Sequence, residues 1–157
     1  MTETQSSELE ERLRADAQQA QRARDQLRLD TLRMTLNAIH LEEVARTDSK
    51  NPNHNKPLTA ADRLAVLEKQ VKQRHEAAAL FRQGNRPELA EKEEKEAAII
   101  QAYLPARLTD DELRQIVSEL VAKHGREFKT IMPLAAKETK GRADGGRVQQ
   151  IVRELTS

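Results

Sequence analysis

Apolar residues recur at helical spacing along most of this 157-residue chain. Leu9 and Leu13, four residues apart in a charged, alanine-rich segment, predict a helix from about Glu8 to Ala23. Asp25 can cap a second helix that runs to about Arg46. Its apolar positions form two adjoining stripes, Leu29, Leu32, Leu36 and Ile39 in one and Leu27, Met34, Ala38 and Leu41 in the other. So wide an apolar face predicts a helix in the interior of a bundle.

The polar residues 47–58, which include two prolines, interrupt this pattern and predict a mobile loop. Thr59 then begins a third helix that Gly84 ends, and Pro87 opens a fourth that runs to about Ala102. The fourth helix contains a tract of alternating glutamates and lysines. We interpret the glutamates of residues 91–96 as a solvated helix face, because lysines at helical spacing accompany them.

Tyr103, Leu104 and Pro105 break the helical pattern, and we predict a domain boundary there. Thr109 and Glu112 then form the capping-box signature T-x-x-E at the start of a further helix. The predicted fold is all-α. An N-terminal domain of about four helices, residues 1–104, is joined to a small three-helix C-terminal domain, residues 105–157.

Basic residues gather around a glycine corner near the C-terminus. Residues 123–153 contain eight Lys or Arg against three Asp or Glu, whereas residues 1–105 contain 17 against 18. Gly141 can adopt the left-handed conformation that closes a helix, and Asp144 can cap the next one. Cations beside free backbone N–H groups suit a phosphate backbone. The candidate RNA-binding residues are Lys129, Lys137, Lys140, Gly141, Arg142 and Arg147. The alternative is an ordinary solvated helical surface.

Composition argues against a catalytic or metal site. The absence of cysteine excludes disulfides, thiol catalysis and thiolate metal ligands. The four histidines, His40, His54, His75 and His124, have no metal-binding spacing, and no phosphate-binding glycine loop is present. We therefore predict no catalytic residue, no metal and no cofactor. No apolar run approaches the ~20 residues of a membrane span, so we expect a cytoplasmic protein without membrane contact. We also expect this protein to be a monomer.

Three segments resemble a known family. They are Leu32-Arg33-Met34 with the helix that follows, the run from Lys92 to Leu108 that ends in Tyr-Leu-Pro, and the Lys140–Asp144 corner. Together they resemble the YqeY-like proteins, and the C-terminal part is similar to the tail domain of the B subunit of the tRNA-dependent amidotransferase (GatB). The resemblance implies an all-helical protein whose tail domain contacts tRNA. The sequence departs from the pattern at Gln149, where asparagine is usual, and at Pro133, which favours a shortened or kinked helix.

Three functional hypotheses follow. The favoured one is a non-catalytic accessory module that binds tRNA or a similar structured RNA by shape, because aromatic residues for base stacking are scarce. The second is a protein-interaction module that docks on an aminoacyl-tRNA synthetase or an amidotransferase, or that self-associates through its N-terminal helices. The third is a carbon–nitrogen ligase activity with glutamine as the amido-nitrogen donor.

Overall fold

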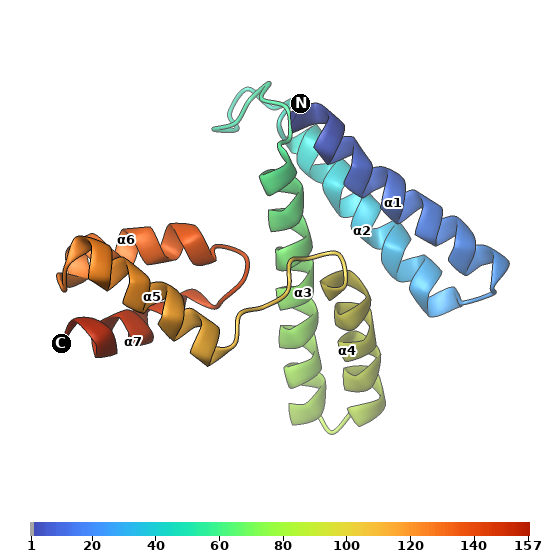
Figure 1. Ribbon diagram of the computed structural model, residues 1–157. Helices are drawn as coiled ribbons and strands as arrows, with labels where there is room; N and C mark the ends of the chain where they lie inside the picture. Colours follow the sequence, from blue (N-terminus) through green and yellow to red (C-terminus); the bar gives the residue numbers. More distant parts are fainter. Residues whose placement is uncertain (1) are drawn as a thin grey trace. The chain divides into compact units, whose positions relative to one another are not determined.

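The computed structural model describes the backbone of residues 2–157 and the side chains from Glu8 onward. Within this range the protein contains seven helices and no strand (Figure 1), which confirms the predicted all-α fold. The helices are α1 (Thr2–Arg22), α2 (Gln26–Ala45), α3 (Ala60–Gln83), α4 (Pro87–Gln101), α5 (Asp110–His124), α6 (Phe128–Thr139) and α7 (Gly145–Thr156). Each helix in residues 2–157 is too short or too polar to cross a bilayer.

Short polar side chains begin several helices as the sequence predicts. Asp25 accepts a hydrogen bond from the backbone N–H of Arg28 at the start of α2. Thr59 and Thr109 each form a complete capping box, with Asp62 at the start of α3 and with Glu112 at the start of α5. An N-cap of this kind stabilises a helix by about 1 kcal/mol. The N-terminal ends of these helices are therefore determined locally.

The helices form two compact units, one ending at Leu104 and one beginning at Pro105. In the first unit α1 lies beside α2 and α3 lies beside α4 (Figure 1). Its core contains aliphatic side chains from all four helices: Leu13, Leu32, Ile39, Leu67, Val71, Ala97 and Ile100. In the second unit α5, α6 and α7 share a separate core made of Leu113, Val117, Ile131, Ala135, Val148, Ile151 and Val152. Each unit thus has its own buried apolar centre.

Only one of the two predicted apolar stripes on α2 is buried. Leu29, Leu32 and Ile39 lie in the core, but Met34 and Leu41 of the second stripe are more than half exposed. The prediction that the whole face is interior is therefore wrong. The reason is geometric: α1, α3 and α4 pack against α2, and they leave the side that carries Met34 and Leu41 uncovered.

The glutamate tract of α4 is not a uniformly solvated face. Glu96 is buried and its carboxylate accepts a hydrogen bond of 3.2 Å from Nε of Arg74, which is also buried on α3. Nη1 of Arg74 donates to the side-chain oxygen of Gln70 at 2.8 Å. Glu94 and Arg82 form a second, exposed pair between the same helices. The interpretation of residues 91–96 as solvated is thus wrong for Glu96, because a cation 22 residues away in sequence compensates its buried charge.

Pro133 lies inside α6 without shortening it. The helix continues for six further residues to Thr139. Ile131 and Ala135, on either side of Pro133, are fully buried, whereas Pro133 itself is exposed. The packing of these neighbours compensates for the N–H that proline lacks.

Candidate nucleic-acid interface

The corner between α6 and α7 is built around Gly141. Gly141 has a φ of 79°, the left-handed conformation that the sequence predicts for it. The N–H of Arg142 donates to the carbonyl of Thr139 at 2.9 Å, and the carbonyl of Arg142 accepts from the N–H of Leu108 at 2.7 Å. Thr139 is buried, and its hydroxyl donates to the carbonyl of Ala135 at 2.7 Å. The corner is therefore held by backbone hydrogen bonds, which leave its side chains free to face solvent.

Four of the predicted cations are exposed and have no acidic partner among the described side chains. Lys129 and Lys137 lie on the side of α6 opposite the buried Ile131, while Lys140 and Arg142 flank Gly141. Among the residues whose side chains are described, no Asp or Glu lies within ion-pair distance of any of the four. Lys129 and Lys137 are eight residues apart, which is roughly 12 Å along a helix. The four charges are thus spread along one helix and its C-terminal corner.

Arg147 differs from these four because it is already paired. Its Nε and Nη2 donate to the two carboxylate oxygens of Asp110 at 2.9 and 2.7 Å, and its Nη1 donates to Gln150 at 2.8 Å. These hydrogen bonds from Arg147 lower the pKa of Asp110 below its usual value. The pair joins the start of α5 to the start of α7. Arg147 is therefore less available for a phosphate than the sequence suggests, since Asp110 lies 37 residues away and gives no local signal.

Asp144 occupies the N-cap position of α7, but its side chain makes no capping hydrogen bond. The predicted capping interaction is therefore wrong. Its Oδ2 lies 3.2 Å from the place that a Cβ on Gly146 would take, so the carboxylate lies beside the first turn of α7 without bonding to it. Around Gly145, a Cβ would have no neighbour within 4 Å. The N-terminus of α7 is consequently without a side-chain cap, although a carboxylate lies beside it.

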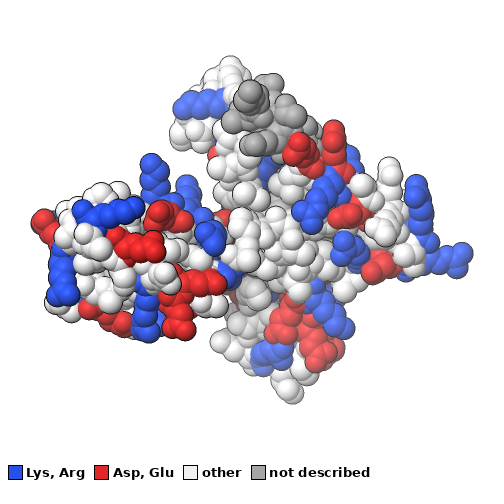
Figure 2. Space-filling view, viewed as in Figure 1, with Lys and Arg blue, Asp and Glu red and all other residues white. Residues whose placement is uncertain are grey.

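Acidic side chains interrupt the basic surface of the second unit. Figure 2 shows Asp and Glu side chains between the Lys and Arg side chains on the face of this unit that is in view. Within this unit, Arg114 also pairs with Glu154 at 3.1 Å. The positive charge of this unit is thus interrupted by acidic side chains and does not form a continuous field.

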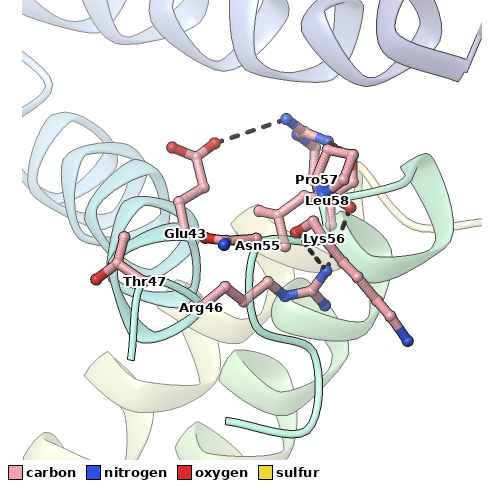
Figure 3. A pocket seen from close by; sticks show the side chains of 8 residues that line it. Glu43, Arg46, Thr47, Asn55, Lys56, Pro57 and Leu58 are labelled. Atoms are coloured by element: carbon pink, nitrogen blue, oxygen red, sulfur yellow. Dashed lines mark hydrogen bonds and ion pairs between the residues drawn. The ribbon is translucent and has the colours of Figure 1, made fainter. Parts of the chain in front are cut away.

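A hollow of about 380 Å³ lies in the first unit, where α2, the loop and α3 meet. Figure 3 shows Arg46 and Glu43 within it and the side chain of Lys56 running outward. The guanidinium of the buried Arg46 donates to Glu42 at 3.3 Å and to the carbonyls of Lys56 and Pro57 at 3.3 and 3.2 Å. Arg46 therefore fixes the end of the loop to the end of α2.

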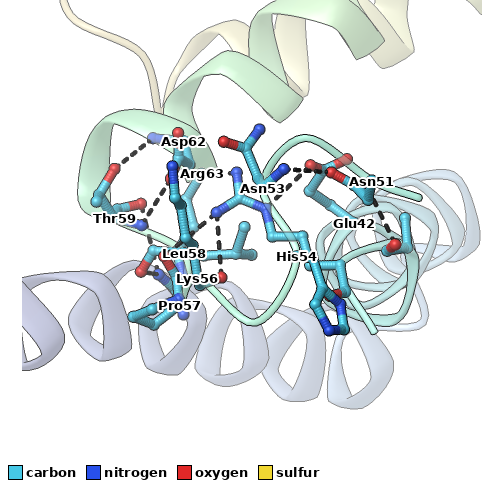
Figure 4. Close-up of polar contacts among 12 residues, drawn as sticks. Glu42, Asn51, Asn53, His54, Lys56, Pro57, Leu58, Thr59, Asp62 and Arg63 are labelled. Atoms are coloured by element: carbon cyan, nitrogen blue, oxygen red, sulfur yellow. Dashed lines mark hydrogen bonds and ion pairs between the residues drawn. The ribbon is translucent and has the colours of Figure 1, made fainter. Parts of the chain in front are cut away.

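Further polar contacts hold residues 47–58 to the end of α2 and the start of α3, and Figure 4 shows this region. The Asn51 side chain donates to the carbonyl of Ala45 at 3.0 Å, and Nδ1 of His54 lies 3.2 Å from the carbonyl of Arg46. Arg63 donates to Glu10 at 2.7 Å and to the carbonyl of Leu58 at 2.6 Å. Composition alone did not reveal these contacts, and the mobility of the loop stays a prediction.

The capping box of α3 also carries charge in this region. The carboxylate of Asp62 accepts from the backbone N–H of Thr59 at 2.9 Å and lies 3.3 Å from Arg46. The hydrogen bond from Thr59 is the main reason that the pKa of Asp62 is lowered. Since Arg46 and Arg63 are both occupied by carboxylates and carbonyls, we interpret this hollow as a structural clasp for the loop.

Tyr103 is a second contact centre that sequence reasoning missed. Its hydroxyl donates to the carboxylate of Asp16, which also lies 3.8 Å from Arg28. The guanidinium of Arg12 lies 4.7 Å from the centroid of the ring. Burial, followed by the interaction with Asp16, raises the pKa of Tyr103 to about 12. These contacts fasten the end of the first unit to α1 and α2, and no sequence signal links positions 87 residues apart.

The histidines form no metal-binding group among the described side chains. His40 lies 3.9 Å from Glu43 on the exposed side of α2. Within the described side chains, no group of three His, Asp or Glu residues has an arrangement that could hold a metal ion.

A curated relative and a family model both match this chain. The chain is 28% identical over 119 residues to the protein named "Altered inheritance of mitochondria protein 41, mitochondrial" from Vanderwaltozyma polyspora. The match covers 72% of this chain and 60% of that relative, so the chain spans less than two thirds of the relative's length. The family model described as Yqey-like protein matches residues 10–156. Because this match extends over almost the whole chain, the protein belongs to the YqeY-like family.

Proposed function

We propose that this protein is a non-catalytic accessory module that binds tRNA or a related structured RNA through its C-terminal basic surface. In this proposal the second unit is related to the tail domain of the amidotransferase B subunit. The observation that supports it best is the set of four exposed cations on α6 and at the corner that no described acidic side chain pairs with: Lys129, Lys137, Lys140 and Arg142. We place this activity in the cytoplasm.

The proposed mechanism is electrostatic recognition of the phosphate backbone. The N-terminus of α7, which no side chain caps, adds backbone N–H groups and the positive end of a helix dipole close in sequence to Lys140 and Arg142. The second unit offers no platform for base stacking, because its single aromatic ring, Phe128, lies beneath Arg153, 5.6 Å from its guanidinium. We therefore propose recognition by shape, with contacts to phosphates and 2′-hydroxyls.

The salt dependence of RNA binding follows from the number of phosphates that the proposed Lys and Arg side chains contact. Each neutralised phosphate contributes about −0.7 to −0.9 to the slope of log K against log salt. Four contacts thus give a slope of about −3. Arg147 would add to this slope only if it left Asp110.

The test compares two pairs of substitutions in the full chain. Lys140→Ala with Arg142→Ala removes both cations that flank Gly141, whereas Lys92→Ala with Lys95→Ala removes the same charge from exposed positions on α4. We would measure binding to total tRNA by fluorescence anisotropy over a salt series. The corner pair should weaken binding and reduce the slope by about 2, and the α4 pair should change neither. Equal effects of the two pairs would contradict the proposed site.

The second candidate function is protein docking, with a synthetase or an amidotransferase as the partner. The specific observation in its favour is the exposure of Met34 and Leu41 on α2. Apolar docking differs from phosphate binding in its weak response to salt. Capture of such a partner by the wild-type chain, but not by a Leu41→Lys variant, at both low and high salt would favour it.

A further inference from the structure

The turn between α1 and α2 is closed by an arginine in a left-handed conformation. Arg24 has a φ of 57°. The N–H of Asp25 donates to the carbonyl of Ala20 at 2.9 Å, and the N–H of Arg24 donates to the carbonyl of Gln21 at 3.2 Å. These two hydrogen bonds form the Schellman motif that ends many helices, and Arg24 occupies the position where glycine is usual.

The turn between α3 and α4 has the same motif with a residue that suits it. There the N–H of Arg86 donates to the carbonyl of Phe81 at 2.7 Å, and the N–H of Asn85 donates to the carbonyl of Arg82 at 3.1 Å. Asn85 takes the left-handed position with a φ of 57°. Asparagine tolerates this conformation because its short polar side chain can bond locally, whereas arginine has no such compensation. An arginine at this position of the α1–α2 turn therefore indicates a role for its side chain.

The end of α1 does not by itself account for Arg24. A cation near a helix C-terminus interacts favourably with the helix dipole, but Arg22 in the last turn already provides this charge. Among the side chains from Glu8 onward, Arg24 donates to no carbonyl, and neither arginine lies within ion-pair distance of an acid. Asp25, the nearest acid in sequence, accepts from the N–H of Arg28 as the cap of α2. Both guanidinium groups are therefore exposed and available to a partner.

The surface at this end of the first unit is basic and polar. We define the α1–α2 end as residues 18–26. Figure 2 shows Lys or Arg side chains projecting where Figure 1 places the turn from α1 to α2, and all the basic residues of positions 1–49 are arginines. Exposed glutamines accompany them: Gln18, Gln19, Gln21 and Gln26. The large exposed apolar side chains of the described residues all lie outside the α1–α2 end.

We propose that the α1–α2 end is a second phosphate-contact surface for the structured RNA that the C-terminal basic surface binds; this inference rests on the proposed RNA-binding function. The planar guanidinium of arginine can donate two parallel hydrogen bonds to one phosphate. Glutamine side chains donate to phosphate and sugar oxygens. A protein partner would instead require an apolar centre in the contact, which the α1–α2 end lacks. Its composition therefore fits a sugar–phosphate backbone better than a protein surface.

The test is the binding of total tRNA to the full chain over a salt series, measured by fluorescence anisotropy. Arg22→Gln with Arg24→Asn should lower the affinity at low salt by about tenfold or more and make the slope of log K against log salt less steep by about 2. The α4 pair, Lys92→Ala with Lys95→Ala, removes the same charge from the first unit and should change neither quantity.

The corner pair, Lys140→Ala with Arg142→Ala, separates this proposal from the proposed function. If the corner pair weakens binding and the pair at Arg22 and Arg24 does not, the second surface is refuted and the C-terminal site stands. If the wild type binds no RNA at low salt, both are refuted. Equal effects of the arginine pair and the α4 pair also refute the second surface.

A stability measurement distinguishes a role of Arg24 in binding from a role in the fold. Arg24→Asn places a residue that tolerates the left-handed conformation, so the urea midpoint of the first unit, followed by Tyr103 fluorescence, should rise while the RNA affinity falls. Arg24→Lys keeps the charge and should lose less affinity than Arg24→Asn. A lower midpoint for Arg24→Asn, or an unchanged affinity, overturns the proposal.

Discussion

The buried pair of Arg74 and Glu96 gives the sharpest prediction about stability. These side chains are 5% and 9% exposed, and they join α3 to α4 at 3.2 Å. Replacing Arg74 by methionine preserves the apolar stem but leaves the Glu96 carboxylate buried without its cation. Breaking a buried pair in this way costs about 3–5 kcal/mol. For a unit of this size, such a loss lowers the melting temperature by roughly 12 °C or more.

The chain offers a local reporter for this measurement. Tyr103 is the single tyrosine and there is no tryptophan, so intrinsic fluorescence in a urea titration follows the first unit alone. With a urea m-value of about 1–3 kcal/mol/M, the midpoint should fall by 1 M or more for Arg74→Met. Arg82→Met is the matched control, because Arg82 pairs with Glu94 between the same helices but in solvent. It should shift the midpoint little.

A double substitution separates charge from packing. Arg74→Met with Glu96→Met removes both charges and should recover most of the lost stability, since an apolar pair is often as stable as a buried ion pair. The reasoning is refuted if Arg74→Met shifts the midpoint no more than Arg82→Met does. It is also refuted if the double variant is less stable than Arg74→Met alone.

Three further predictions concern the hydroxyl of Tyr103, the glycine corner and the Arg147 pair. The absorbance of tyrosinate should titrate with a pKa of about 12 rather than 10, and a midpoint near 10 would contradict the buried contact. Because this folded-state pKa is raised, the contribution of Tyr103 to stability is complete below pH 10 and is lost between about pH 10 and 12. Gly141→Ala should destabilise the second unit by about 1–2 kcal/mol, because the backbone φ of Gly141 is positive. Gly145→Ala should not destabilise it, because a Cβ there meets no neighbour within 4 Å. Thermal unfolding followed by circular dichroism compares the two variants. Asp110→Asn should release Arg147 and thereby raise the affinity for total tRNA. The slope of log K against log salt should become steeper by about 1. An unchanged slope would show that Arg147 does not reach the RNA.

Features that depend on neighbouring residues could be predicted from the sequence. A capping box requires a hydroxyl residue and an acidic residue three positions apart, and the boxes at Thr59 and Thr109 are both present in the structure. The left-handed Gly141 and the first-turn Pro87 follow from the backbone preferences of these residue types, and both are confirmed. The all-α fold follows from the spacing of the apolar positions for the same reason.

Features that depend on distant partners could not be predicted. The pattern of α2 does not say which side the other helices cover, so the exposure of Met34 and Leu41 appears only in the structure. The burial of Glu96 depends on Arg74, and the pairing of Arg147 depends on Asp110, 37 residues away. For the candidate interface, the sequence indicates which residues are basic, and the structure adds which of them already have an acidic partner.

The most direct measurement of the central proposal is the binding of total tRNA to the full chain over a salt series. We predict micromolar or tighter binding at low salt and a slope of log K against log salt of about −3 or steeper, as expected for four or more phosphate contacts. No binding at low salt, or binding whose affinity does not change with salt, would contradict the RNA-binding function.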